Sequence, residues 1–138
     1  SRKKAFAFSE PISNNALIIT ADTIVWIDGK ALNKPSTETE AKEMLRTLSG
    51  RVHEVYTGVT LKSNLKIRSF SVMTKVHFKN LSEEEIDFYT ATYKPYDKAG
   101  AYGAQEWIGF VAVEKIEGSY FNVMGLPTKE LYEELLKF

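Results

Sequence analysis

The sequence predicts a single α/β domain in which a mixed sheet is flanked by helices. Its length of 138 residues suits one domain. Apolar, β-branched runs and amphipathic stretches follow one another in the order strand, helix, hairpin, helix, strand, helix, which is typical of this class. Two of the helices also begin at a serine or threonine with the spacing of a capping box.

The first strand is expected over residues 16–28, ALIITADTIVWID, where a nearly continuous apolar run is typical of a strand buried on both faces. The DGK at its end predicts a turn. A helix should begin near Thr37, because Thr37 and Glu40 are spaced to cap each other's free backbone N–H groups. Gly50 is its expected end. The apolar stripe of this helix is Ala41, Met44, Leu45 and Leu48.

Residues 52–61 and 66–78 predict two strands joined by a turn at residues 63–64, and therefore a hairpin. Ser82 and Glu85 repeat the capping-box spacing just before EEIDFYTATY, which predicts a second helix. The opening stretch SRKKAFAF is also typical of part of a helix.

Residues 109–116, GFVAVEKI, predict a further strand. Pro127 and Thr128 are expected to open a last amphipathic helix. Its apolar face is Leu131, Leu135 and Leu136.

Composition excludes several kinds of protein. The chain has no cysteine, which excludes a disulfide framework, a zinc–thiolate site and a thiol nucleophile, and agrees with the expected cytoplasmic location. Its formal net charge is 0, so a broad nucleic-acid surface is not expected, although a local basic pocket is compatible with it. No apolar run reaches the roughly 18 residues of a membrane span, so no membrane partner is expected.

Asp22 is the most informative single residue, because a carboxylate inside an apolar strand is costly unless it is paired, hydrogen-bonded or metal-bound. One interpretation is a strand-end Asp that caps a neighbouring backbone. The other is a general base or a carboxylate that holds a metal directly or through water. The neighbouring Thr23 fits an ordinary strand position on its side-chain pattern alone.

Two loop lysines and a glycine loop complete a possible phosphate site. Lys34 precedes a proline, and Lys98 opens the stretch DKAGAYGAQ, which ends at Gln105. Lysines and backbone N–H groups bind phosphate oxygens, while a carboxylate binds water or Mg²⁺. The alternatives are solvated lysines and a plain turn. The P-loop and the dinucleotide-binding glycine fingerprint are both absent.

Four blocks in order, ADTIVWIDGKALNKP, LSGRVHEVYTGV, YDKAGAYGAQ and IEGSYFNVMGLP, resemble the Maf family of nucleoside triphosphate pyrophosphatases. ADT together with AGAYGAQ resembles the branch that acts on dTTP and UTP. The resemblance implies an α/β fold of the Maf and ITPase type with a cleft between two lobes. It also implies hydrolysis of dTTP and UTP, with modified pyrimidine nucleotides as further candidates, to the monophosphate and pyrophosphate. A divalent metal, Mg²⁺ or Mn²⁺, and a homodimer are implied as well.

The resemblance also implies roles residue by residue. Asp22 matches the family's proton acceptor. Thr23 and Gln105 match positions tied to substrate choice. Lys34 and Lys98 match basic residues that face the phosphates.

One departure from the family pattern is large. Family members begin with a strand, loop and helix carrying S-x-S-P-R-R, followed by an acidic residue, and no such motif occurs in residues 1–138. We therefore expect a single Maf-like domain that lacks this arginine loop, in a truncated or incompletely represented member. The alternative function is a non-catalytic nucleotide-binding module linked to cell division, with this chain inactive. Under a third interpretation the chain is a plain interaction domain, and the residues of the four blocks serve only for packing.

Overall fold

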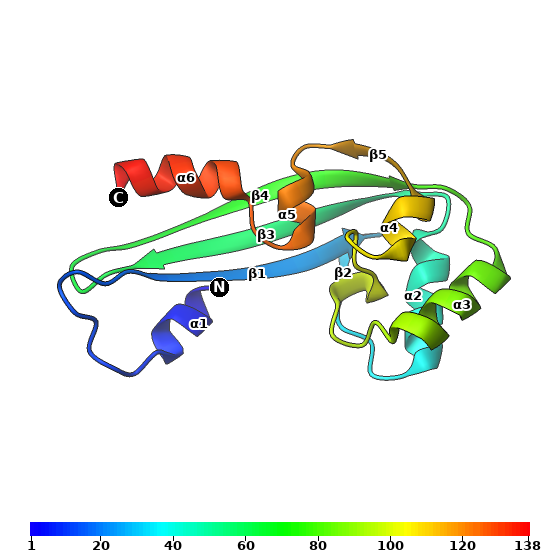
Figure 1. Ribbon diagram of the computed structural model, residues 1–138, viewed down its shortest axis with the longest axis horizontal. Helices are drawn as coiled ribbons and strands as arrows, with labels where there is room; N and C mark the ends of the chain where they lie inside the picture. Colours follow the sequence, from blue (N-terminus) through cyan, green and yellow to red (C-terminus); the bar gives the residue numbers. More distant parts are fainter.

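Five antiparallel strands form the centre of the protein in a computed structural model that describes residues 1–138 (Figure 1). Their order in the sheet is β2-β1-β3-β4-β5. The strands are β1 (Ile18–Ile27), β2 (Lys30–Leu32), β3 (Val52–Lys62), β4 (Ile67–Phe78) and β5 (Val113–Glu117). The α/β class is confirmed, but all four strand pairings are antiparallel, so the sheet is not mixed.

Short turns explain two of these antiparallel pairings. Asp28 and Gly29 join β1 to β2, and both have positive φ, as in the type I′ turn that suits a tight hairpin. A short turn likewise joins β3 to β4, as expected from the sequence. Because β2 pairs only with Val25, Trp26 and Ile27, the earlier part of β1 has one free edge.

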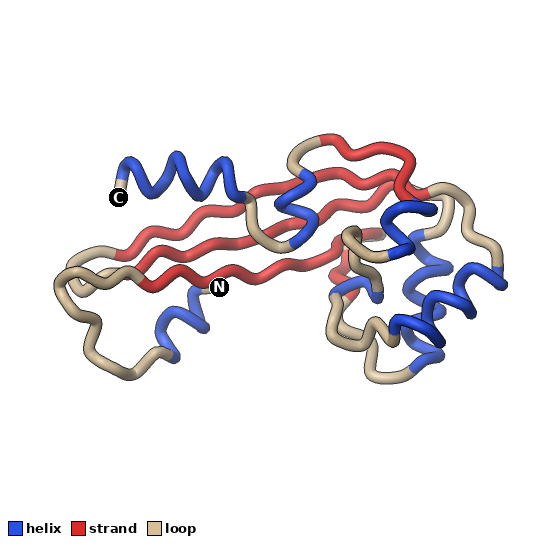
Figure 2. The backbone as a smooth tube through the Cα atoms, in the orientation of Figure 1, coloured by secondary structure: helices blue, strands red, loops and turns tan.

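Six α-helices and one 3₁₀ turn surround the sheet (Figure 2). They are α1 (Arg2–Ala7), α2 (Glu38–Leu48), α3 (Glu83–Tyr93), η1 (Ala99–Ala101), α4 (Trp107–Ala112), α5 (Tyr120–Met124) and α6 (Thr128–Lys137). None of these helices has the length and apolar character needed to cross a membrane.

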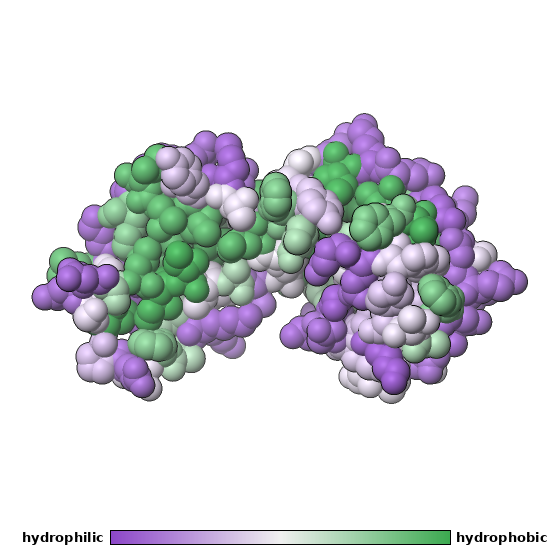
Figure 3. All heavy atoms as spheres, viewed as in Figure 1, coloured by the Kyte–Doolittle hydropathy of each residue, from purple (hydrophilic) through white to green (hydrophobic).

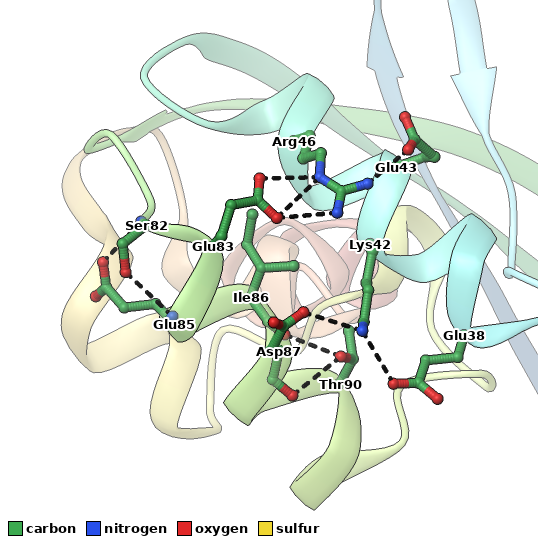
Figure 4. Close-up of polar contacts among 10 residues, drawn as sticks. All are labelled: Glu38, Lys42, Glu43, Arg46, Ser82, Glu83, Glu85, Ile86, Asp87 and Thr90. Carbon is green, nitrogen blue, oxygen red and sulfur yellow. Dashed lines mark hydrogen bonds and ion pairs between the residues drawn. The ribbon is translucent and has the colours of Figure 1, made fainter.

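Helices α2 and α3 lie side by side and are joined by ion pairs on their exposed faces (Figure 4). Arg46 of α2 binds Glu83 of α3 at 2.9 Å, and Lys42 binds Asp87 at 2.9 Å. The capping box predicted at Ser82 is present in full. The Thr37 hydroxyl caps α2 as predicted, but the Glu40 carboxylate accepts from the backbone N–H of Ser36 instead of Thr37.

The molecule has two lobes joined by a narrower waist, and β1, β3 and β4 run through both (Figures 1 and 3). One lobe contains α2, α3 and α4 and holds a core of 16 buried residues that includes Leu45, Val76 and Tyr89. The other lobe contains α1 and α6 and holds a much smaller core cluster of three buried residues, Val59, Leu61 and Leu131. Its surface carries much apolar area (Figure 3).

Three sequence-based expectations were wrong in detail. Strand β1 is not buried on both faces, because Val25 and Ile27 are buried while Asp22 and Trp26 are exposed. Residues 109–116 do not form one strand, since Trp107–Ala112 is helical and β5 begins at Val113. Short apolar runs fit either element, and periodicity alone does not separate them. In α6, Leu131 is buried but Leu136 is 71% exposed.

Candidate active site

A cleft of about 270 Å³ lies over β1 and β3, beside the free edge of β1, and is lined by all five residues singled out in the sequence. Asp22 and Thr23 come from β1, and Lys34 comes from the segment after β2. Lys98 and Gln105 flank η1. The opposite wall includes Gly125 at the end of α5. Four segments far apart in the sequence therefore meet at one site.

Asp22 projects from this edge with its side chain 55% exposed. Its carboxylate accepts a hydrogen bond from Nζ of Lys4 at 3.1 Å, and the same ammonium donates to the carbonyl of Ala21 at 3.3 Å. The carboxylate is thus neither isolated in the core nor a backbone cap. Lys4, on α1, is its ion-pair partner beside the cleft, and both side chains are more than half exposed.

Thr23 faces the other side of β1 and is only partly exposed. Its hydroxyl lies 2.8 Å from the hydroxyl of Thr57 on β3. Thr57 is fully buried and donates to the main-chain carbonyl of Asn122 on α5 at 3.1 Å. The side chain of Thr23 is therefore tied to the cleft wall that α5 builds.

Lys98 is held by two carboxylates. Its Nζ lies 3.2 Å from Asp97 and 3.0 Å from Glu106. Partial burial lowers the pKa of Lys98, but hydrogen bonds to the two carboxylates outweigh it and the pKa is raised overall. The hydrogen bond from Lys98 is the main cause that lowers the pKa of Asp97, and the charge of the exposed Lys34 adds to the effect.

The glycines of the 97–105 loop have distinct packing roles. Gly100 has a φ of +70°, and a Cβ there would lie 2.9 Å from the Val25 side chain. A Cβ at Gly103 would lie 2.5 Å from the Glu106 carboxylate and 2.8 Å from the Lys98 side chain. The backbone N–H of Gly103 donates to the hydroxyl of Tyr89 at 3.1 Å. The small residues thus let the loop close over the core and let Lys98 cross it.

Sequence reasoning missed Lys4, Thr57, Glu106 and Asn122. Lys4 lies 18 positions from Asp22, and Thr57 lies 34 positions from Thr23, so no local pattern pairs them. Asn122 lies within the block IEGSYFNVMGLP, which was the one available signal. Gln105 lines the cleft with an exposed side chain, as a residue available to a ligand would.

The donor set bears on a divalent metal. No group of three or more His, Asp or Glu side chains converges to form a protein-only metal site. Asp22 and Asp97 both line the cleft. Mg²⁺ is commonly bound by one or two carboxylates together with substrate phosphates and water, and that arrangement fits these residues.

A cleft that gathers three lysines, two carboxylates and an exposed amide beside the edge of a sheet is of the class suited to a small polyanionic ligand bound together with a cation. The chain belongs to the Maf family: the model described as Maf-like protein matches residues 1–138.

Curated relatives agree with this membership. The chain is 56% identical over 135 residues to a protein of Phocaeicola vulgatus named dTTP/UTP pyrophosphatase, covering 98% of this chain and 70% of the relative. A protein of the same name from Porphyromonas gingivalis is 52% identical over 140 residues, covering 100% and 70%. Another, from Flavobacterium johnsoniae, is 52% identical over 132 residues, covering 96% and 68%.

Proposed function

We propose that this protein hydrolyses dTTP and UTP to the nucleoside monophosphate and pyrophosphate. The observation that carries the proposal is the convergence of Asp22, Lys34, Lys98, Thr23 and Gln105 on one cleft. The names of the relatives support the same activity and lend no support to a purely regulatory module. Modified pyrimidine nucleotides are further candidate substrates.

The chemical step is the attack of water on the α-phosphorus. The new P–O bond forms as the bond to the bridging oxygen breaks, and pyrophosphate leaves with the electron pair. Asp22 accepts the proton of the attacking water, since a carboxylate beside the cleft is suited to general-base catalysis. The Lys4 ammonium at 3.1 Å is the ion-pair partner of that carboxylate.

Lys34 and Lys98 stabilise the charge that develops on the leaving pyrophosphate. Glu106 and Asp97 offset the charge of Lys98, and Asp22 offsets that of Lys4, so the cleft is close to electrically balanced. This balance favours a substrate that arrives with Mg²⁺ or Mn²⁺, which Asp22 would help to hold. The metal would supply charge neutralisation of the triphosphate.

Gln105 is proposed to read the base together with Thr23. A glutamine amide carries N–H donors, which suit a carbonyl beside the imide N–H of uracil or thymine, while the imide N–H itself is left for Thr23. A homodimer, a cytoplasmic location and a truncated or incompletely represented family member stay predictions. Reading the upstream coding sequence for an in-frame S-x-S-P-R-R tests the last of these.

The test of the proposed function uses protein expressed from the complete coding sequence. It is incubated with each nucleoside triphosphate and Mg²⁺ or Mn²⁺, and the products are separated and identified. Release of pyrophosphate with UMP or dTMP is expected. Release of orthophosphate, or no product from UTP and dTTP, would overturn the proposal.

Asp22→Asn is the first expected variant effect. The change keeps the shape and removes the proton acceptor, so kcat should fall by on the order of 100-fold or more while nucleotide binding survives. Asp87→Asn is the matched control, because Asp87 has a similar exposure of 57% and also binds a lysine, at 2.9 Å, but lies on α3. Near-normal turnover in Asp22→Asn would exclude the assigned role.

A further inference from the structure

A buried chain of hydrogen bonds runs beneath Thr23 and ends at a group that only accepts. The Thr23 hydroxyl lies 2.8 Å from the Thr57 hydroxyl, which lies 3.1 Å from the main-chain carbonyl oxygen of Asn122. Thr57 and Asn122 are both 0% exposed, so water does not compete for the bond between them, whereas the bond between Thr23 and Thr57 is only partly buried.

The position of that carbonyl is fixed. The Asn122 side-chain nitrogen shares its two protons among three acceptors, the carbonyls of Val55 at 3.3 Å and Val72 at 3.1 Å and the hydroxyl of Thr74 at 3.0 Å. These bonds attach the short helix α5 to β3 and β4. The backbone N–H of Gly125 also donates to the Asn122 carbonyl, at 3.0 Å. The Asn122 carbonyl therefore cannot move away from Thr57.

Counting the hydroxyl protons in this series of hydrogen bonds shows which group donates in each bond. A hydroxyl has one proton to donate, and a carbonyl oxygen has none. Thr57 uses its single proton on the Asn122 carbonyl, so in the bond between the two threonines Thr57 accepts. Thr23 consequently spends its own proton on Thr57 and has only lone pairs left for the cleft.

We propose that Thr57 is a specificity-determining residue that makes Thr23 an obligate hydrogen-bond acceptor toward the ligand. The group that it selects is an N–H donor, and the imide N–H of uracil or thymine is such a group. The ring nitrogen of cytosine at the same place is an acceptor and meets lone pairs. This inference rests on the proposed function and adds the reason for its base preference.

Gly125 leaves the Thr23 hydroxyl accessible. A Cβ built at Gly125 would lie 3.6 Å from Oγ1 of Thr23, and both residues line the cleft. The hydroxyl is thus held from below by Thr57 and remains open on the side where a ligand enters.

The test is Thr57→Val, which keeps the side-chain shape but removes the acceptor. Thr23 then regains a proton that it can donate to cytosine. We measure kcat/KM for UTP and CTP, and dissociation constants for their non-hydrolysable α,β-imido analogues. The preference for the uridine compounds should shrink by about 5-fold or more, since an unpaired buried polar group costs roughly 1–3 kcal/mol. Thr57→Ser keeps a hydroxyl at this position and should therefore keep the wild-type preference. Thr57→Ala serves as a second variant in case valine disturbs folding.

Thr60→Val is the matched control. Thr60 is also 0% exposed and on β3, but its hydroxyl bonds Ser1 and Ser69, away from Thr23. The Thr60→Val variant should keep the wild-type ratio of kcat/KM for UTP to kcat/KM for CTP. A ratio unchanged in both Thr57→Val and Thr57→Ala, or a wild-type protein without uridine preference, overturns the inference while hydrolysis stands. Uridine-selective binding of the analogues without hydrolysis would instead overturn only the proposed function.

Discussion

At the scale of single residues, most cations of the cleft are paired with carboxylates before any ligand arrives. Lys4 binds Asp22, and Lys98 binds Asp97 and Glu106. Lys34 is exposed and makes no ion pair. A bound triphosphate therefore competes with existing partners for two of the lysines and meets the third without competition.

Lys34→Ala should therefore weaken binding or turnover for all nucleotides alike, because it removes charge from the phosphate end of the site.

Gln105→Ala should instead narrow the preference for UTP over CTP, because it removes a base contact. The measurement is kcat/KM for both nucleotides in both variants. Lys98→Ala is a less clean probe, since it also leaves Glu106 without its cation. A base-specific loss in Lys34→Ala, or an equal loss on both nucleotides in Gln105→Ala, would contradict these roles.

Asp22, Lys34 and Lys98 were singled out from the sequence itself and Thr23 and Gln105 through the family resemblance, whereas the partners of these residues were not predicted. Asp22 stands out because a carboxylate interrupts an apolar run, and the two lysines flank turn-forming segments. Their chemical roles stay predictions. Lys4, Thr57 and Asn122 look like ordinary helix, strand and loop residues, and only the tertiary pairing of β1, β3 and α5 brings them to the site.

At the scale of secondary-structure elements, local signals predicted those elements that end in strong caps or tight turns. The helix after Ser82 and the hairpin of β3 and β4 lie where their capping and turn residues placed them, and the last helix begins at Thr128 after Pro127 without a side-chain cap. The strand predicted over residues 109–116 was wrong because tertiary packing decides the structure of this segment. A Cβ at Gly109 would lie 1.8 Å from the Ala104 carbonyl oxygen, so only glycine lets α4 approach the loop that contains Ala104.

Ser82→Ala should lower the free energy of unfolding by about 1 kcal/mol, because it removes half of a complete capping box. The Ser82 hydroxyl accepts from the Glu85 N–H at 3.1 Å, and Glu85 accepts from the Ser82 N–H at 2.9 Å. Urea denaturation followed by circular dichroism measures the effect. Ser71→Ala, at an exposed strand position, is the control and should change stability little. Equal stability of the two variants would contradict the prediction.

At the scale of the whole molecule, the larger core contains a histidine that folding keeps neutral. His53 is 1% exposed and packs against the rings of Phe78 and Tyr102, and its Nε2 lies 2.6 Å from the Tyr102 hydroxyl. Burial is the main cause that lowers the pKa of His53 to about 4, and the nearby His77 adds to it.

This depressed pKa predicts an acid sensitivity. Between pH 6.5 and about 4 the unfolded chain binds a proton at this position and the folded protein does not, so stability falls as pH falls. The loss attributable to His53 should reach up to about 3 kcal/mol. The free energy of unfolding is measured for wild type and His53→Gln at several pH values. The difference between the two proteins isolates the contribution of His53, because exposed carboxylates contribute to both. Parallel pH profiles of the two proteins would contradict the assignment.

The strands that form one side of the cleft also run without interruption through both lobes, and this continuity limits how the molecule can move. A hinge needs a loop or an element end at which backbone angles change, and β1, β3 and β4 offer none between the lobes. Large swings of one lobe against the other are therefore disfavoured. Nucleotide should enter a pre-formed opening in a single step, with an observed association rate that rises linearly with concentration and shows no plateau from a slow closing event.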